Sequence, residues 1–213
     1  MRPLPCPLLA VTDRSLCSMP LDKQVERIFA GGGKWLWFRD KDLPHAERKH
    51  LAHRLLQLAA QYGALVSIGS DVELAVEVQA TAAHVSTAGD VEYARKRMGA
   101  AALIGMSAHS LQEVLDAASA GADYATLSPI FLTSSKPGYG PALGTDVIAG
   151  AAKTGLPIVA LGGVALDNLA QVRAAGVSGA AMMGTIMAAR EPETFVASFL
   201  RTWNGRPDTA TAS

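Results

Sequence analysis

Short apolar runs recur along the chain at regular intervals, each followed by a more polar segment. Within most runs the apolar residues are continuous rather than alternating, which is typical of strands covered on both faces in a parallel sheet. The runs that we interpret as strands are, in order, Leu8–Thr12, Lys34–Arg39, Ala64–Ile68, Ala82–Ser86, Ala102–Ser107, Tyr124–Ser128, Pro157–Leu161 and Gly179–Met183.

The segments between these runs show the spacing of amphipathic helices. In the first of them Val25, Ile28 and Phe29 fall on one face, as in a helix that packs against a sheet. The clearest helices are predicted over Leu21–Ala30, Ala46–Tyr62, Leu111–Ala120 and Asn168–Ala175. Glycines follow several segments and predict left-handed helix ends. These glycines are Gly31, Gly63, Gly99, Gly121, Gly155 and Gly176.

Eight strand–helix units with right-handed crossovers close naturally into a barrel. We therefore predict an α/β fold, a single (β/α)8 TIM barrel over residues 1–203, followed by a disordered tail over residues 204–213. An open doubly wound sheet is the alternative. It predicts a glycine-rich phosphate loop after the first strand, but Thr12–Ser15 contains no glycine.

Composition narrows the choice of partner. Lys and Arg together number 19 and so do Asp and Glu, so no net charge attracts nucleic acid or an anionic membrane. No apolar stretch has the length of a membrane span, and prolines near the N-terminus argue against a signal peptide, so the cytoplasm is the expected location. The cysteines and histidines show no metal-ligand spacing. A small molecule is the expected partner, and a homo-oligomer is left open.

The candidate chemistry lies where strands end, because a barrel of this kind builds its site at the carboxyl ends of its strands. Gly162 and Gly163 follow the seventh predicted strand, and Gly184 and Thr185 follow the eighth. Glycines let backbone N–H groups approach an oxyanion, and these two strands carry the recurrent phosphate position of the fold. The alternative is that the glycines only make tight turns.

Two cations follow the second predicted strand. By strand alternation Trp37, Arg39 and Lys41 share a face, which in a barrel can point toward the mouth and bind a second phosphate or a pyrophosphate. A solvated rim of charges is an equal alternative. The long loop after the sixth strand, Phe131–Pro141, carries hydroxyls, a lysine and glycines that suit a lid over phosphate oxygens, although an ordinary flexible loop has the same composition.

Two histidines end strands. His109 follows the fifth strand and could act as a general acid or base, or could serve a helix start, because Ser110 resembles an N-cap. His84 ends the fourth strand and faces either the core or the pocket.

Taken in order, these residues resemble the superfamily of thiamine phosphate synthase and the TenI-type thiazole tautomerases. The resemblance runs from about Leu8 to Trp203. The matching residues are Arg39 and Lys41 of the strand-two pattern, Gly105, Ser107, His109 and Ser110 of the strand-five pattern, Pro129, Ile130, Phe131, Thr133, Ser135 and Lys136 of the strand-six signature, and Gly162 and Gly163 after strand seven.

The resemblance implies a site for two substrates. In the synthase a pyrimidine pyrophosphate loses pyrophosphate with magnesium assistance, and a thiazole phosphate captures the pyrimidine cation. By this resemblance the pyrophosphate is held by Arg39, Lys41, Ser107, Thr133, Ser135 and Lys136, and the thiazole phosphate by Gly163, Gly184 and Thr185. His84 is placed near the pyrimidine.

Four residues depart from the synthase pattern. Gly69-Ser70 stands where the synthase has Asn-Asp, Gly89 stands at the second metal-binding aspartate, and Trp37 replaces a glutamine that reads the pyrimidine. Mg²⁺ is the cofactor that the resemblance suggests, but its expected ligands are missing. Asp71 and Asp90 each lie one residue away. We therefore predict no metal ligands.

The tautomerases of the superfamily also lack the metal pair. They move a proton on a thiazole carboxylate phosphate, and His109 matches the histidine implicated in that step. We therefore expect tautomerase-type isomerase chemistry rather than the full transferase reaction of a synthase. The alternatives are a non-catalytic barrel that senses or carries a phosphorylated thiazole or pyrimidine, and a different phosphate-barrel isomerase.

Overall fold

The computed structural model, which describes residues 2–132 and 141–205, is a closed barrel of parallel strands in the order β1-β2-β3-β4-β5-β6-β7-β8. β8 pairs with β1, so the sheet has no free edge. All eight strands lie within or beside the predicted apolar runs, and the TIM barrel is confirmed. The strands are β1 Leu8–Val11, β2 Trp35–Phe38, β3 Leu65–Gly69, β4 Ala82–Val85, β5 Leu103–Ala108, β6 Tyr124–Leu127, β7 Ile158–Leu161 and β8 Gly179–Met182.

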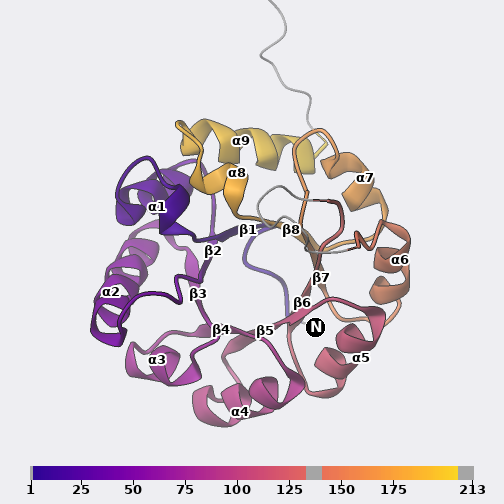
Figure 1. Ribbon diagram of the computed structural model, residues 1–213, viewed down its shortest axis with the longest axis horizontal. Coiled ribbons are helices and arrows are strands. Elements are labelled where there is room, and N and C mark those ends of the chain that lie inside the picture. The colour runs from indigo at the N-terminus through magenta and orange to yellow at the C-terminus, as the bar shows by residue number, and fades with distance from the viewer. Residues whose placement is uncertain (1, 133–140, 206–213) are drawn as a thin grey trace, which may run out of the picture.

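The helices surround the barrel as an outer ring (Figure 1). They are α1 Leu21–Ala30, α2 His45–Tyr62, α3 Val72–Glu77, α4 Ala88–Met98, α5 Leu111–Ser119, α6 Asp146–Ala152, α7 Leu169–Ala174, α8 Gly184–Met187 and α9 Pro192–Trp203, with a 3-10 turn η1 at Arg14–Leu16. None of the described helices is long and apolar enough to cross a membrane.

The barrel interior is filled by side chains rather than left as a channel. Trp35 and Tyr124 are fully buried, and their rings meet edge to face with centroids 4.7 Å apart. Trp35 Nε1 donates to the hydroxyl of Ser67, which is also fully buried. These side chains form the closed layer on which the site rests.

Glycines end the helices in more than one way. Gly63 closes α2 with φ 58°, as the sequence predicts. The same prediction is wrong for Gly31, whose φ is −70°. A Cβ there would lie 2.5 Å from the backbone oxygen of Glu193, so Gly31 is required by close packing against the start of α9, and the positive φ falls on Gly32 instead.

The predicted tail and lid lie largely outside the described residues. α9 ends at Trp203, and residues 206–213 are not described. Within the expected lid, residues 133–140 are not described either, so the predicted phosphate ligands Thr133, Ser135 and Lys136 have no structural account.

Candidate functional site

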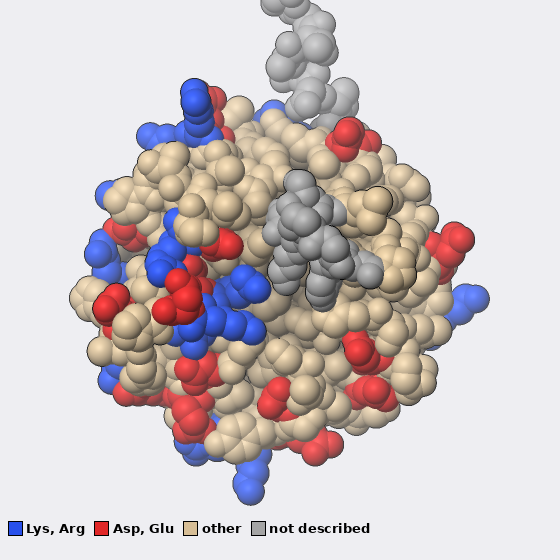
Figure 2. Space-filling model, in the orientation of Figure 1, with Lys and Arg blue, Asp and Glu red and all other residues tan. Residues whose placement is uncertain are grey.

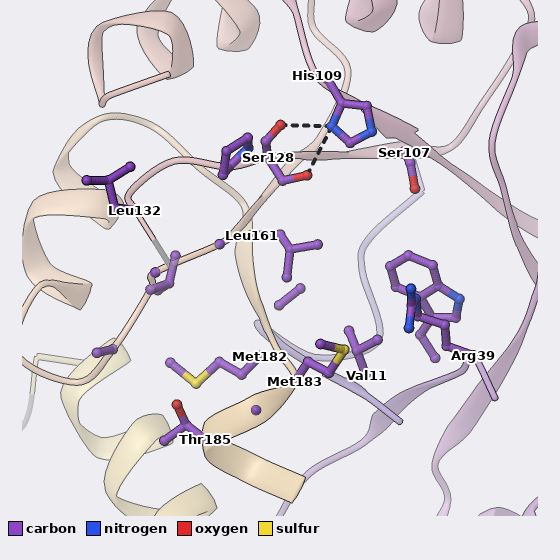
Figure 3. Close-up of a pocket in the computed structure, with 18 of the residues that line it drawn as sticks. Val11, Arg39, Ser107, His109, Ser128, Leu132, Leu161, Met182, Met183 and Thr185 are labelled. Atoms are coloured by element: carbon purple, nitrogen blue, oxygen red, sulfur yellow. Dashed lines mark hydrogen bonds between the residues drawn. The ribbon is translucent and has the colours of Figure 1, made fainter. Parts of the chain in front are cut away.

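A cavity of about 400 Å³ opens at the carboxyl ends of the strands. Most of the predicted site residues in the described part of the chain line this one cavity, and Figure 3 shows them converging from opposite sides of it. The predicted residues in its wall are Arg39, Lys41, Ser107, His109, Gly162, Gly163, Gly184 and Thr185. The resemblance therefore grouped residues that do lie together in space.

Gly162 and Gly163 form the turn that leaves β7. Their φ angles are 89° and 66°, a region that residues with side chains rarely adopt. A Cβ on Gly162 would lie 2.8 Å from Pro129 Cα, and one on Gly163 would lie 2.6 Å from the backbone oxygen of Leu132. The glycines are therefore needed for a tight turn, as the alternative interpretation holds, because the segment after β6 crosses directly over them. The same crossing puts their backbone at the cavity surface.

Asn168 fixes the orientation of this turn. Its side-chain amide donates to the carbonyl of Gly163 at 2.9 Å, and its side-chain oxygen accepts from the N–H of Ala165 at 2.9 Å. Because a trans peptide unit is planar, a Gly163 carbonyl turned toward Asn168 puts the N–H of Val164 on the opposite side of that unit. Val164 lines the cavity, so the turn presents a donor with a fixed direction.

The second glycine exit follows β8. Gly184 begins the single turn α8, and its N-cap residue Met183 makes no side-chain bond to the first N–H groups. The first-turn N–H groups of a helix have no partner within it. Gly184 and the exposed Thr185 line the cavity, so backbone donors and one hydroxyl face the space beside the β7 turn.

His109 stands on the opposite side of the cavity from Thr185 in Figure 3. Its Nδ1 lies 2.9 Å from the carbonyl oxygen of Ser128. A carbonyl can only accept, so we assign the proton to Nδ1, which leaves the lone pair of the neutral ring on Nε2. The helix-start interpretation is also borne out, because the Ser110 hydroxyl caps α5 through the N–H of Glu113.

His84 occupies a different environment and does not line the cavity. It is fully buried, with Nδ1 2.9 Å from the Tyr124 hydroxyl and Nε2 3.0 Å from the Ser107 hydroxyl. Burial, and then the charge of Lys41, lowers the pKa of His84 to about 3, so the ring is neutral near pH 7. The expectation of a direct ligand contact by His84 therefore differs from the structure, which places it beneath Ser107 as a support.

The sequence motif around Ser107 has a packing reason as well. A Cβ on Gly105 would lie 2.0 Å from the ring of Tyr124, so only glycine fits there. Tyr124 in turn bonds His84, and His84 bonds Ser107. The Ser107 hydroxyl at the cavity wall is thus held by a chain of buried polar groups that begins at Tyr124.

Arg39 and Lys41 form the cationic side of the cavity. Within the described residues neither side chain has a hydrogen bond or an ion pair to any group of the protein, unlike most arginines of the chain. Burial and the neighbouring Arg39 and Arg48 guanidinium groups lower the pKa of Lys41 below its ordinary value of 10.5. Figure 2 shows blue side chains reaching toward the central hollow on the side where α1 and α2 lie. Two adjacent cations without carboxylate partners suit an anionic ligand.

Trp37 closes the wall between β2 and β3. It is 5 % exposed, and its ring packs on His84 with centroids 3.8 Å apart. A Cβ on Gly69 would lie 2.5 Å from Trp37 Nε1, so the indole occupies the space that a side chain at position 69 would need. The Trp37 indole and the missing side chain of Gly69 therefore fit each other in space.

The donors near this wall do not fit a divalent cation. Asp71 accepts from Arg48 and caps α3 through the N–H of Leu74, each at 2.9 Å. Asp90 is engaged by the N–H and hydroxyl of Thr87 in a capping box. Neither aspartate lines the cavity, and the described residues contain no group of three or more His, Cys, Asp or Glu side chains that could hold a metal. The residues described at this wall therefore do not fit a bound Mg²⁺ ion.

The sequence prediction missed three serines of the cavity wall. Ser70, Ser86 and Ser128 all line it, and Ser128 also orients His109. Ser86 and Ser128 are the last residues of their predicted strands, so their position at a strand exit was a usable signal.

The sequence is similar to those of known proteins over most of its length. Residues 8–186 match the family model described as thiamine monophosphate synthase. The chain belongs to this family. A thiamine-phosphate synthase of Acidithiobacillus ferrooxidans is 36 % identical over 208 residues, which cover 94 % of this chain and 95 % of the relative. One from Halorhodospira halophila is 34 % identical over 185 residues, covering 86 % and 88 %.

A solved structure supports the fold as well as the family. Thiamine phosphate pyrophosphorylase from Pyrococcus furiosus superposes with a TM-score of 0.82 at 27 % identity, covering 93 % of this chain and 95 % of that one. The family assignment thus rests on sequence and on structure over nearly the whole chain.

Proposed function

We propose that this family member binds a phosphorylated thiazole and moves a proton on its ring, as a tautomerase-type isomerase, without a divalent metal. The observation that carries the proposal is His109, whose Nδ1 bond to the Ser128 carbonyl sets its tautomer at the wall of the cavity that also holds the glycine turns.

The phosphate ester is held at the carboxyl ends of β7 and β8. The N–H groups of the Gly162–Val164 turn and of Gly184, with the Thr185 hydroxyl, supply donors to its oxygens. Backbone donors keep their positions without side-chain ordering, so the ester end of the ligand anchors the ring in a fixed place. The ring then extends toward His109 across the cavity (Figure 3).

His109 performs the proton transfer. Nε2 takes a proton from the sp3 ring carbon, the C–H electron pair moves into the ring as the exocyclic double bond shifts, and the imidazolium returns the proton to the exocyclic carbon. The Ser128 carbonyl stabilises the ring in its doubly protonated form because it accepts from Nδ1. No atom is gained or lost, and the product is the aromatic tautomer of the thiazole carboxylate phosphate.

The transfer of a pyrimidine is disfavoured by the opposite wall. Expelling pyrophosphate places negative charge on its oxygens, which a divalent ion stabilises. Gly69 leaves no room beside Trp37 for the asparagine of the synthase pattern, Ser70 stands in place of its aspartate, and Asp71 is held by Arg48. The remaining cations, Arg39 and Lys41, suit a ring carboxylate as well as a phosphate.

The test supplies the purified protein with the non-aromatic thiazole carboxylate phosphate and follows the absorbance of the aromatic product. We expect turnover in EDTA, and a loss of about 10²- to 10⁴-fold in kcat for His109→Asn with unchanged affinity for thiazole phosphate. His45→Asn is the matched control, since His45 lies exposed on α2 in an ion pair with Glu77.

A second assay offers the pyrimidine pyrophosphate with thiazole phosphate and Mg²⁺. Robust magnesium-dependent formation of thiamine phosphate would show that the synthase reaction survives and that the proposal is wrong. Ligand binding without either turnover, equally in wild type and His109→Asn, would assign the protein to the non-catalytic alternative.

A further inference from the structure

We infer that Arg14 is a positioning residue that keeps Asp42 away from Arg39 and Lys41, so that these two cations remain open to the ligand. The inference rests on the proposed function only in that the cavity takes an anion. Arg14 begins η1, outside the cavity wall, and nothing in the sequence motifs singled it out.

Charges alternate along the segment that follows β2. Arg39 and Lys41 are each followed by an aspartate, so two carboxylates lie next to two cations in the chain. A second, smaller cavity of about 180 Å³ is lined by Asp13, Asp40 and Asp42 together with Arg39 and Lys41. The two cations therefore form the partition between a ligand cavity on one side and a carboxylate-lined cavity on the other. Internal ion pairs across this partition would compete with an incoming anion.

Arg14 engages both nearest carboxylates. Its two terminal nitrogens donate to the two oxygens of Asp42 at 2.6 Å each, a bidentate pair with a defined geometry. The same guanidinium lies 3.4 Å from Asp40 Oδ1, and the Arg14 backbone N–H donates to that oxygen at 2.9 Å. Neither aspartate lines the larger cavity, so the arginine binds both negative charges outside the ligand cavity.

The two aspartates depend on Arg14 to different degrees. Asp40 is 2 % exposed in its side chain and keeps the Thr12 hydroxyl and a backbone N–H as partners even without the guanidinium. The Thr12 hydroxyl also accepts from the N–H of Arg39, which fixes the strand exit. The Asp42 side chain is 68 % exposed, and the Arg14 guanidinium binds its carboxylate. Loss of Arg14 therefore releases Asp42, which can then pair with Lys41 next to it in the chain.

The experiment measures the affinity of the full-length protein for inorganic pyrophosphate by calorimetry, in a double-mutant cycle. Arg14→Ala is expected to weaken binding at least fivefold. Asp42→Asn in the wild-type background is expected to change it less than twofold. The double variant Arg14→Ala/Asp42→Asn is expected to bind within twofold of wild type. The melting temperature of each variant checks that the barrel stays folded.

A control separates positioning from net charge. Arg14→Ala/Asp13→Asn restores the same charge, and Asp13 lines the same small cavity, where it caps η1. Asp13 accepts from the N–H and hydroxyl of Ser15, so neutralising it leaves Asp42 released, and we expect this variant to bind as weakly as Arg14→Ala. Equal rescue by Asp13→Asn, or an equal effect of Asp42→Asn with and without Arg14, would show that only overall charge matters and would overturn the inference. Absence of pyrophosphate binding in the wild type would also overturn this inference, because Arg39 and Lys41 would then hold no such anion, whereas the proposed function fails only in the turnover assay with the thiazole carboxylate phosphate.

Discussion

The two sides of the cavity offer different kinds of groups to a ligand. At the ends of β7 and β8 the donors are backbone groups held by glycine geometry, with Asn168 turning the Gly163 peptide. At the end of β2 they are the side chains of Arg39 and Lys41, which stay available because Arg14 binds the neighbouring carboxylate. The direction of a backbone donor depends on the conformation of the chain. The availability of a side-chain cation depends on whether a neighbouring carboxylate is bound elsewhere.

This difference explains which parts of the site follow the family pattern. Gly162 and Gly163 cannot change without a collision, since an added Cβ would lie 2.8 Å from Pro129 Cα at Gly162 and 2.6 Å from the Leu132 oxygen at Gly163. The β2 and β3 side can exchange one filling for another, as the pair Trp37 and Gly69 shows.

The largest effect is expected on the glycine side. Gly163→Ala combines a φ of 66° with a Cβ 2.6 Å from the oxygen of Leu132, so we expect at least a tenfold loss of phosphate affinity and a destabilisation of about 2–4 kcal/mol. Gly63→Ala is the control, because its φ is 58° and nothing lies within 4 Å of the added atom. It should cost about 1–2 kcal/mol and leave phosphate binding intact. Calorimetry and thermal unfolding decide, and equal effects of the two variants on affinity would contradict the comparison.

A second effect is expected below the cationic side, in the response to acid. The unfolded chain has an ordinary histidine at position 84, whereas burial lowers the pKa of His84 to about 3 in the folded protein. The unfolded state therefore binds more protons, and stability falls as pH drops below about 6.5, with a slope approaching 1.4 kcal/mol per pH unit. Urea unfolding between pH 5 and pH 7 measures the slope, and His84→Gln should flatten it. A slope that His84→Gln leaves unchanged would show that the pKa of His84 is the same in the folded and unfolded states.

The smallest effect is expected at the rim. Lys41→Met should weaken pyrophosphate binding about three- to tenfold, because the lysine is partly solvated and its charge is screened. Since the pKa of Lys41 lies below 10.5, the wild-type affinity should begin to fall at a lower pH than for an ordinary lysine. Lys41→Arg should bind equally well from pH 7 to pH 10. Calorimetry across this range tests the prediction, which fails if the wild type and Lys41→Arg share one pH profile.

Much of the fold could be predicted because the strands are continuously buried. β6 begins at Tyr124 and β8 at Gly179, where the apolar runs predict them, since every residue of these strands is covered by barrel or helix. Gly31 shows the limit. Its role is set by contact with Glu193, more than 150 residues along the chain, and no local pattern carries that information.

The candidate site also contains residues that the sequence could predict and residues that it could not. Strand exits placed His109 and the glycines at the mouth, because position along a barrel strand determines the layer. His84 also ends a strand, but the register of β4 against Gly69 and Gly105 puts it beneath the cavity, where Tyr124 binds it. The Arg14 contact joins two strand exits and depends on side-chain conformation, so spacing in the sequence could not reveal it.

The most direct measurement is a titration of ¹⁵N-labelled protein with thiazole phosphate, once in EDTA and once in Mg²⁺. The account predicts saturable binding with the same Kd in both, and amide shifts that concentrate at Gly162, Gly163, Gly184 and Thr185. Binding that requires Mg²⁺, or shifts that leave these amides unmoved, would contradict it.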